Sequence, residues 1–346
     1  MTSHERGAQR ALWYSHCGHS PLAIAIQNGW IAEDLAGENI ALKSVKRDGS
    51  PDEQLSHYDH HIPWSVRQGG SAPALWARSI GTDTRLIGIN WLDEFQAVIA
   101  LPGSGIITGR DLAGRRLGLL SANHPIDHTK AAHLRGYLTA LDLAGLSLRD
   151  VELVELPETL ASFSSPGAEE GQPTYRPGGR GVDALRNGLI DALFVRGPHG
   201  VAVVDALKAV VVTAISDHPD PLVRVNNGTP RPLTVHARLL RDRPDVVARL
   251  LRRVASVGAW APRNADEAAR LIGKQSGVGV STVARAYAGQ LADRLTTTLD
   301  DVAVAGLEAY KRFLFEHRFL PFDFSITEWI ESRPLHSAQA RQPVHA

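Results

Sequence analysis

The chain alternates short apolar runs with segments of helical periodicity along most of its length. Runs typical of strands occur at residues 12–14, 40–42, 84–89, 96–100, 117–120, 151–155, 192–195, 209–215 and 233–237. Helical patterns occur at residues 21–29, 72–79, 128–145, 182–187 and 201–207, and residues 244–312 are almost entirely helical in pattern. This alternation predicts an α/β fold of parallel sheets covered by helices.

The order of these runs predicts two lobes. Residues 104–216 contain the strands and helices of a complete smaller α/β lobe, inserted into a larger lobe formed by residues 1–103 and 217–346. We expect the chain to cross between them near residues 100–103 and 217–224, with a ligand-binding cleft between the lobes. The Pro- and Gly-rich stretch 161–179 is either a loop that covers this cleft or a surface loop.

Composition excludes several classes of function. The 37 Lys and Arg residues balance 37 Asp and Glu residues, so we expect no nucleic-acid or membrane partner. The apolar runs are much shorter than the roughly 20 residues of a membrane-spanning helix. The polar start of the chain lacks the apolar stretch of a secretion signal. The sequence therefore predicts a cytoplasmic protein that acts on a small molecule. We expect a monomer, although the sequence leaves the oligomeric state open.

The single cysteine, Cys17, lies in a polar loop between a strand and a helix that begins at Pro21. One cysteine excludes an intramolecular disulfide and any Cys-rich zinc or iron–sulfur site. A helix N-terminus and nearby imidazoles lower the pKa of a thiol, which points to a nucleophile or a proton donor. The alternative is a buried apolar filler, which is the usual role of a free cysteine.

A second polar cluster runs from His57 to Gly70. His57 can pair with a thiol, Arg67 can hold an oxyanion through two parallel N–H bonds, and the backbone of Gly70 can come close to a ligand. His60 and His61 compete with His57 as the partner of the thiol. The spacing of the three histidines lacks a regular metal-binding pair, so we expect no metal and no cofactor. The alternative is a solvent-facing loop with incidental histidines.

Several familiar motifs are absent from the sequence. It contains no phosphate-binding loop, no dinucleotide-binding glycine pattern after a strand and no Gly-x-Ser-x-Gly elbow, which argues against nucleotide-binding and serine-hydrolase functions. Residues 109–118, Gly-Arg-Asp-Leu-Ala-Gly-Arg-Arg-Leu-Gly, predict a short helix that turns directly into a strand. This arrangement opens the inserted lobe in many type II periplasmic-binding-protein folds.

With these residues in view, the chain resembles the 2'-hydroxybiphenyl-2-sulfinate desulfinase family of bacterial dibenzothiophene desulfurisation. The resembling segments are residues 12–17, 57–70, 85–89, 111–118, 188–193, 243–244 and 277–282. The resemblance implies an α/β, two-lobed, type II periplasmic-binding-protein-like fold with an interlobe cleft. It also implies a hydrolase that cleaves the C–S bond of an organic, aromatic sulfinate and releases sulfite.

The family uses one cysteine, one histidine, one arginine and a glycine N–H, which correspond here to Cys17, His57, Arg67 and Gly70. The resemblance implies that Arg67 and Gly70 hold the sulfinate. Cys17, hydrogen-bonded to His57, would then either protonate the carbon that bears sulfur or attack the sulfur. The sequence departs from the family at residues 18–21 and is shorter at residues 120–151, which leaves the choice between aryl and alkyl sulfinates open.

Other functions are compatible with the same fold. A non-catalytic cytoplasmic small-molecule-binding protein would need no nucleophile. A thiamine-pyrimidine precursor synthase-like enzyme also depends on histidine, but that family carries a cysteine-rich iron-binding motif that a single cysteine cannot supply. A metal-dependent hydrolase could use the histidine cluster, and metal analysis of the purified protein would test it.

Overall fold

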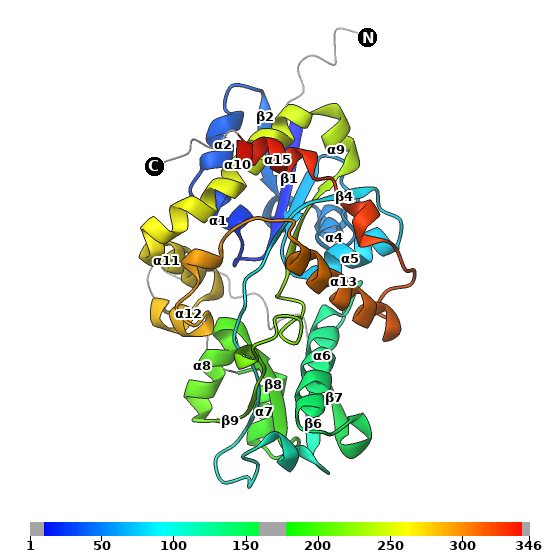
Figure 1. The fold of residues 1–346 in the computed structure, drawn as a ribbon, viewed down its shortest axis with the longest axis vertical. Helices are drawn as coiled ribbons and strands as arrows, with labels where there is room; N and C mark the ends of the chain where they lie inside the picture. The colour runs from blue at the N-terminus through cyan, green and yellow to red at the C-terminus, as the bar shows by residue number, and fades with distance from the viewer. Residues whose placement is uncertain (1–9, 159–177, 341–346) are drawn as a thin grey trace.

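Two α/β lobes, each built around a five-stranded sheet, stack along the long axis of the molecule (Figure 1). The computed structural model describes residues 10–158 and 178–340. Within these ranges, none of the helices combines the length and apolar character that a bilayer crossing requires. The α/β class predicted from the sequence is confirmed, and the loop expected at residues 161–179 lies almost wholly outside the described residues.

The first lobe holds the sheet β2-β1-β3-β10-β4. Its strands are β1 (Arg10–His16), β2 (Ile40–Ser44), β3 (Ser65–Gln68), β4 (Thr84–Asn90) and β10 (Arg231–His236). Its helices are α1 (Pro21–Gln27), α2 (Trp30–Leu35), α3 (Val45–Asp48), α4 (Pro51–Asp59), α5 (Ser71–Ser79), α9 (Ala237–Asp242), α10 (Pro244–Trp260), α11 (Ala265–Ser276), α12 (Val280–Ala286), α13 (Asp301–Glu316), α14 (Ile326–Trp329) and α15 (Arg333–Ala340).

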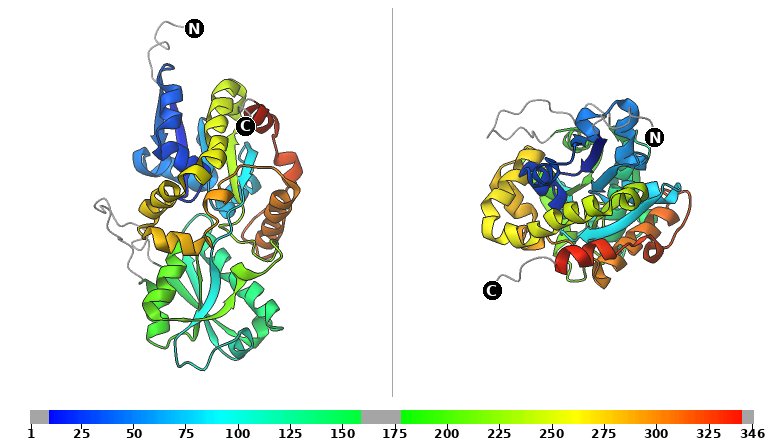
Figure 2. Two further views of the ribbon diagram at one scale, coloured as in Figure 1. Left: turned by 60° about the vertical axis from the view of Figure 1, so that its left-hand side comes forward. Right: turned by 90° about the horizontal axis from the view of Figure 1, so that it is seen from above.

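The second lobe holds the sheet β7-β6-β8-β5-β9. Its strands are β5 (Gln96–Ala100), β6 (Arg116–Ala122), β7 (Glu152–Glu158), β8 (Ala192–Arg196) and β9 (Val210–Ala214), and its helices are α6 (His128–Leu143), α7 (Arg180–Arg186) and α8 (Gly197–Leu207). Residues of α6 pack in one apolar cluster, and residues of α7 and α8 pack in another. Figure 2 shows this lobe below the first when the molecule is turned by 60°.

The two sheets are mixed, whereas the sequence pattern predicted parallel sheets. Strand β10 runs antiparallel to β3 and β4, and β5 runs antiparallel to β8 and β9. The domain prediction also placed residues 96–100 in the larger lobe, but β5 is an interior strand of the second sheet. The chain therefore crosses before Gln96. An apolar run that is buried along its whole length suits either sheet, so the pattern could not assign it.

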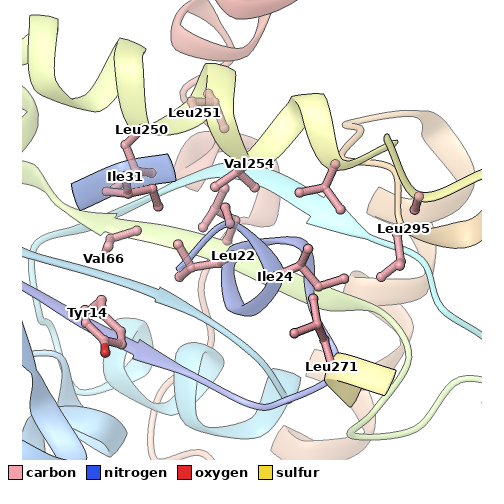
Figure 3. Packing of buried hydrophobic residues seen from close by; sticks show 14 of the residues in the cluster. Tyr14, Leu22, Ile24, Ile31, Val66, Leu250, Leu251, Val254, Leu271 and Leu295 are labelled. Atoms are coloured by element: carbon pink, nitrogen blue, oxygen red, sulfur yellow. The ribbon is translucent and has the colours of Figure 1, made fainter. Parts of the chain in front are cut away.

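The core of the first lobe fixes the helix that follows Cys17. Ser20 caps α1 by accepting a hydrogen bond from Ala23 N, and Pro21 occupies the first turn. Leu22 and Ile24 of α1 then pack with side chains of α10 (Figure 3). Burying each such side chain stabilises the folded state by about 2 kcal/mol. The start of α1 is therefore held firmly against the core.

Candidate active site

Two loops meet at the carboxyl ends of β1 and β3. These strands are parallel neighbours, and their register sets His16 beside Gln68. Cys17 N donates a hydrogen bond to Gln68 O over 3.0 Å, and Gly70 N donates to Cys17 Sγ over 3.4 Å. The structure thus brings the cysteine and the glycine of the predicted site into direct contact, although they are 53 positions apart in sequence.

Gly69 and Gly70, which follow β3, lie too close to neighbouring residues to carry a side chain. A Cβ on Gly69 would lie 2.5 Å from Cys17 Sγ, and a Cβ on Gly70 would lie 2.8 Å from Asn227 Nδ2. Asn227 itself caps α5, because its backbone oxygen accepts from Ser71 N and its Oδ1 accepts from Ala72 N. The two glycines therefore let the backbone lie between the thiol and the residue that caps α5.

Arg67 is fully buried beside this loop, with 1% of its surface exposed. Its Nε donates to His57 O over 2.9 Å and its Nη2 donates to Gly70 O over 3.1 Å. Its Nη1 is buried without a hydrogen-bond partner among the described residues. The two parallel N–H bonds expected for an oxyanion are thus made to the backbone, which leaves Nη1 as the guanidinium nitrogen without a partner in the described structure.

His57 lies in the last turn of α4 and is buried. Its Nδ1 is 2.6 Å from Ser15 Oγ, and within the described chain it shares no hydrogen bond with Cys17, in contrast to the predicted pairing. Burial, followed by the charges of Lys46 and Arg67, holds the pKa of His57 well below its usual range. His57 is therefore a neutral imidazole.

The two competing histidines have other partners. His60 is buried, with Nε2 at 3.4 Å from Ser65 O and Nδ1 at 3.3 Å from Thr234 Oγ1. His61 Nδ1 lies 2.7 Å from the Asp59 carboxylate. Neither ring shares a hydrogen bond with the loop of Cys17 in the described structure.

The charges around Cys17 decide its protonation. Burial raises the pKa of the thiol, but the cations of Lys46 and Arg67, the N–H of Gly70 and the charge of Arg231 outweigh it, so the pKa is lowered. Lys46 and Arg231 were not predicted from the sequence. Lys46 lies in α3, and Arg231 lies on β10, more than 200 residues from Cys17.

The second lobe adds aromatic rings to this site. The hydroxyl oxygen of Tyr58, in α4, lies 3.0 Å from Nδ1 of His124, which follows β6. The rings of Tyr58, His124 and His128 are near parallel, with centroids 5.1 to 6.2 Å apart, and Tyr58 meets His57 edge-on at 4.9 Å. Sequence reasoning missed both second-lobe histidines, because only the contact between lobes sets them beside His57. In the described ranges, no set of three His, Cys, Asp or Glu side chains is arranged to hold a metal.

The two stacked sheets and the site between the lobes place the chain among two-lobed α/β proteins with the fold of periplasmic binding proteins. One similar solved structure is the periplasmic aliphatic sulphonate binding protein SsuA from Escherichia coli, with a TM-score of 0.63, 17% identity and coverage of 93% of this chain and 98% of that chain. At this identity the likeness shows the fold. No family model matches the sequence.

Within that class, the chain is similar to 2'-hydroxybiphenyl-2-sulfinate desulfinase from Rhodococcus erythropolis, with 26% identity over 92% of this chain and 90% of the relative. It is also similar to the crystal structure of a cysteine-to-serine variant of the desulfurization enzyme DszB in complex with biphenyl-2-sulfinic acid. That match has a TM-score of 0.74 and 25% identity, and it covers 97% of this chain and 100% of the other. These comparisons confirm the resemblance inferred from the sequence.

Proposed function

We propose that the protein is a desulfinase that cleaves the C–S bond of an organic sulfinate and releases sulfite. Similarity to a curated sulfinate desulfinase over most of both chains supports this function. The observation that carries it is the setting of Cys17: its Sγ accepts from Gly70 N, and the charges of Lys46, Arg67 and Arg231 act on it. In the described part of the chain, Arg67 also keeps a buried Nη1 without a hydrogen-bond partner. A sulfinate is a small anion with two acceptor oxygens, which is the ligand such a site favours.

Arg67 binds the sulfinate in this proposal. Its Nε and Nη2 are fixed on backbone carbonyls, so Nη1 donates from an orientation that is set before the substrate arrives. Gly70 N donates to Cys17 Sγ, so its first role is to hold the thiol. The sulfinate adds a negative charge beside Cys17 and thereby raises the pKa of the thiol, because two like charges share one site.

Cys17 is the proton donor in the reaction we propose. The thiol protonates the carbon that bears sulfur, the C–S bond breaks with its electron pair on that carbon, and sulfur dioxide leaves. Water adds to sulfur dioxide to give hydrogen sulfite, and the released proton restores the thiol. Neutral His57 lies with its Nδ1 2.6 Å from Ser15 Oγ and shares no hydrogen bond with Cys17 among the described residues, so no step of this reaction passes through it.

An aryl sulfinate suits the surroundings of the site. Tyr58, His124 and His128 offer near-parallel rings beside His57, and such rings stack on an aromatic group. We therefore propose aromatic sulfinates as the substrate class, and hydrolysis as the reaction class, since water is the co-reactant.

Sulfite release from a panel of aryl and alkyl sulfinates tests this function, using wild type and Cys17→Ser after treatment with a chelator. We expect release by wild type alone, fastest with aryl sulfinates. A sulfinate that binds tightly without any release would favour the binding-protein function instead. Mass spectrometry of the wild type during turnover tests the role of Cys17, because an adduct of the sulfinate on Cys17 would show a nucleophile rather than a proton donor.

A further inference from the structure

His19 lies two residues after Cys17, in the segment where the sequence departs from the desulfinase family. Its Nε2 is 2.5 Å from Ser276 Oγ at the end of α11, and its Nδ1 is 2.6 Å from the hydroxyl of Tyr287, which follows α12. Both contacts join the Cys17 loop to residues more than 250 positions away. The function proposed above makes no use of this histidine.

The hydrogen bonds around His19 have a defined direction. Ser276 Oγ donates to Ile272 O over 2.8 Å, so it accepts from His19, and Nε2 of His19 carries the proton. Nδ1 then accepts from the Tyr287 hydroxyl. Burial, followed by the charge of Arg231, lowers the pKa of His19 to about 3, so the ring stays neutral and this pattern persists at neutral pH.

Both partners of His19 are connected to the second lobe. Ser276 O lies 2.8 Å from Nε2 of His199 in α8. Tyr287 lies near enough to Arg231 for the guanidinium charge to act on its hydroxyl, and Arg231 forms an ion pair with Glu94 over 3.0 Å. Glu94 also pairs with Arg196 of the second lobe, over 2.6 Å. Ser276 therefore contacts both His19 and the second lobe, and Tyr287 lies beside the Arg231–Glu94 pair that links to it.

The rest of the Cys17 loop has little room to move independently. A Cβ on Gly18 would lie 2.3 Å from Oε1 of Gln275, so the loop backbone packs directly on α11. Ser20 Oγ donates to Cys17 O over 3.1 Å and caps α1. A displacement of His19 would consequently move Cys17 relative to Arg67 and Gly70.

We propose that His19 is a positioning residue for Cys17 and that it couples the position of the thiol to the contact between the lobes. Its ring holds the loop so that Sγ remains on Gly70 N and within the field of Arg67 and Arg231. The inference rests on the proposed function in one respect, since it takes Cys17 to be the reacting group.

The test compares His19→Phe, which removes both hydrogen bonds, with His19→Gln, which retains one donor and one acceptor, and with His336→Gln as a surface control. Two readouts are measured: kcat and KM for sulfite release, and the pH dependence of alkylation of Cys17 by iodoacetamide. Alkylation reports on one site, because the chain has a single cysteine.

We expect His19→Phe to lower kcat by about tenfold or more with KM changed less than about threefold, since a misplaced group loses rate rather than binding. Its alkylation profile moves to higher pH, because the thiol leaves the cations that lower its pKa. His19→Gln recovers most of both properties. Unchanged kcat and alkylation profiles with a lower Tm would overturn the proposal and leave His19 a purely structural residue.

A second variant covers the case in which His19→Phe is unstable. If His19→Phe does not fold, Tyr287→Phe decides, because it removes one hydroxyl and keeps the ring; an unchanged kcat and alkylation profile there would also overturn the proposal. If wild type releases no sulfite, the proposed function fails, whereas the alkylation profiles still show whether His19 positions the thiol.

Discussion

At the scale of single residues, the lowered pKa of Cys17 depends on fixed cations rather than on the imidazoles around it. The sequence suggested that neighbouring histidines would lower the pKa of the thiol. In the structure, burial holds the pKa of His16 at about 4 and that of His19 at about 3, so these rings carry no charge at neutral pH. Lys46, Arg67 and Arg231 supply the positive charge instead.

Replacing Lys46 tests this account. In Lys46→Met the largest charge effect that lowers the pKa of Cys17 is lost, so the thiol deprotonates at higher pH and the alkylation profile shifts upward. Lys43→Met is the matched control, because Lys43 is an exposed lysine on β2 whose Nζ lies over the ring of Trp13. Equal profiles for wild type and Lys46→Met, measured at low ionic strength, would contradict the role of Lys46.

Gly69→Ala tests the close approach of the loops. The new Cβ would lie 2.5 Å from Cys17 Sγ, so either the thiol or the strand end must shift. We expect kcat to fall by at least about tenfold. Gly37→Ala is the control, because nothing lies within 4 Å of its new Cβ, and it should retain wild-type kcat. The proposed packing is wrong if Gly69→Ala is as active as that control.

At the scale of elements, the sequence predicts individual helices and strands well, but it does not predict which elements pack against one another. Around Cys17, the strand follows from the apolar run at residues 12–14, and the capped helix follows from Ser20 and Pro21. The position of β5 does not follow from its sequence, because a fully buried strand has the same pattern in either sheet. The site divides in the same way. Residue type and resemblance were enough to propose Cys17, His57, Arg67 and Gly70. Contacts between distant elements bring in Lys46, Arg231 and the second-lobe histidines, and a sequence pattern does not show such contacts.

Helix α4 offers a test of how one element supports the site. Ser50 and Glu53 form a capping box at its start, and His57 and Tyr58 lie near its end. Ser50→Ala should lower the free energy of unfolding by about 1 kcal/mol, measured in urea, with KM unchanged. Ser281→Ala, an exposed serine within α12, should leave stability unchanged or slightly higher. A large change in KM for Ser50→Ala would show that the cap also shapes the site.

At the scale of the whole molecule, one buried carboxylate pairs with arginines from both sheets. Glu94 lies where the chain crosses between the sheets, has 4% of its surface exposed, and pairs with Arg196 from β8 and Arg231 from β10. The backbone at Gly228 packs against it so closely that a Cβ there would lie 2.0 Å from Oε1. Burial raises the pKa of Glu94, but the two arginines outweigh it and the pKa is lowered.

Glu94→Gln should therefore be among the more damaging single substitutions in the molecule. It leaves two arginines, one of them buried, without their shared counter-charge, and we expect the free energy of unfolding to fall by about 3 kcal/mol. Asp205→Asn, which breaks the exposed pair with Arg285, should cost less than about 1 kcal/mol. Urea unfolding at neutral pH compares the two variants, and equal losses would contradict the role of Glu94.

The pH dependence of unfolding shows whether the charge of Glu94 stabilises the folded protein. The pKa of Glu94 in the folded protein lies below its ordinary 4.5, so the carboxylate contributes stability that is fully present above the unfolded-state pKa and is lost as the pH falls through the folded-state value. The difference in unfolding free energy between wild type and Glu94→Gln should thus be constant above about pH 5 and shrink at lower pH. A difference that grows on acidification would mean that Glu94 is protonated in the folded protein, and the charge-based connection between the lobes would then be wrong.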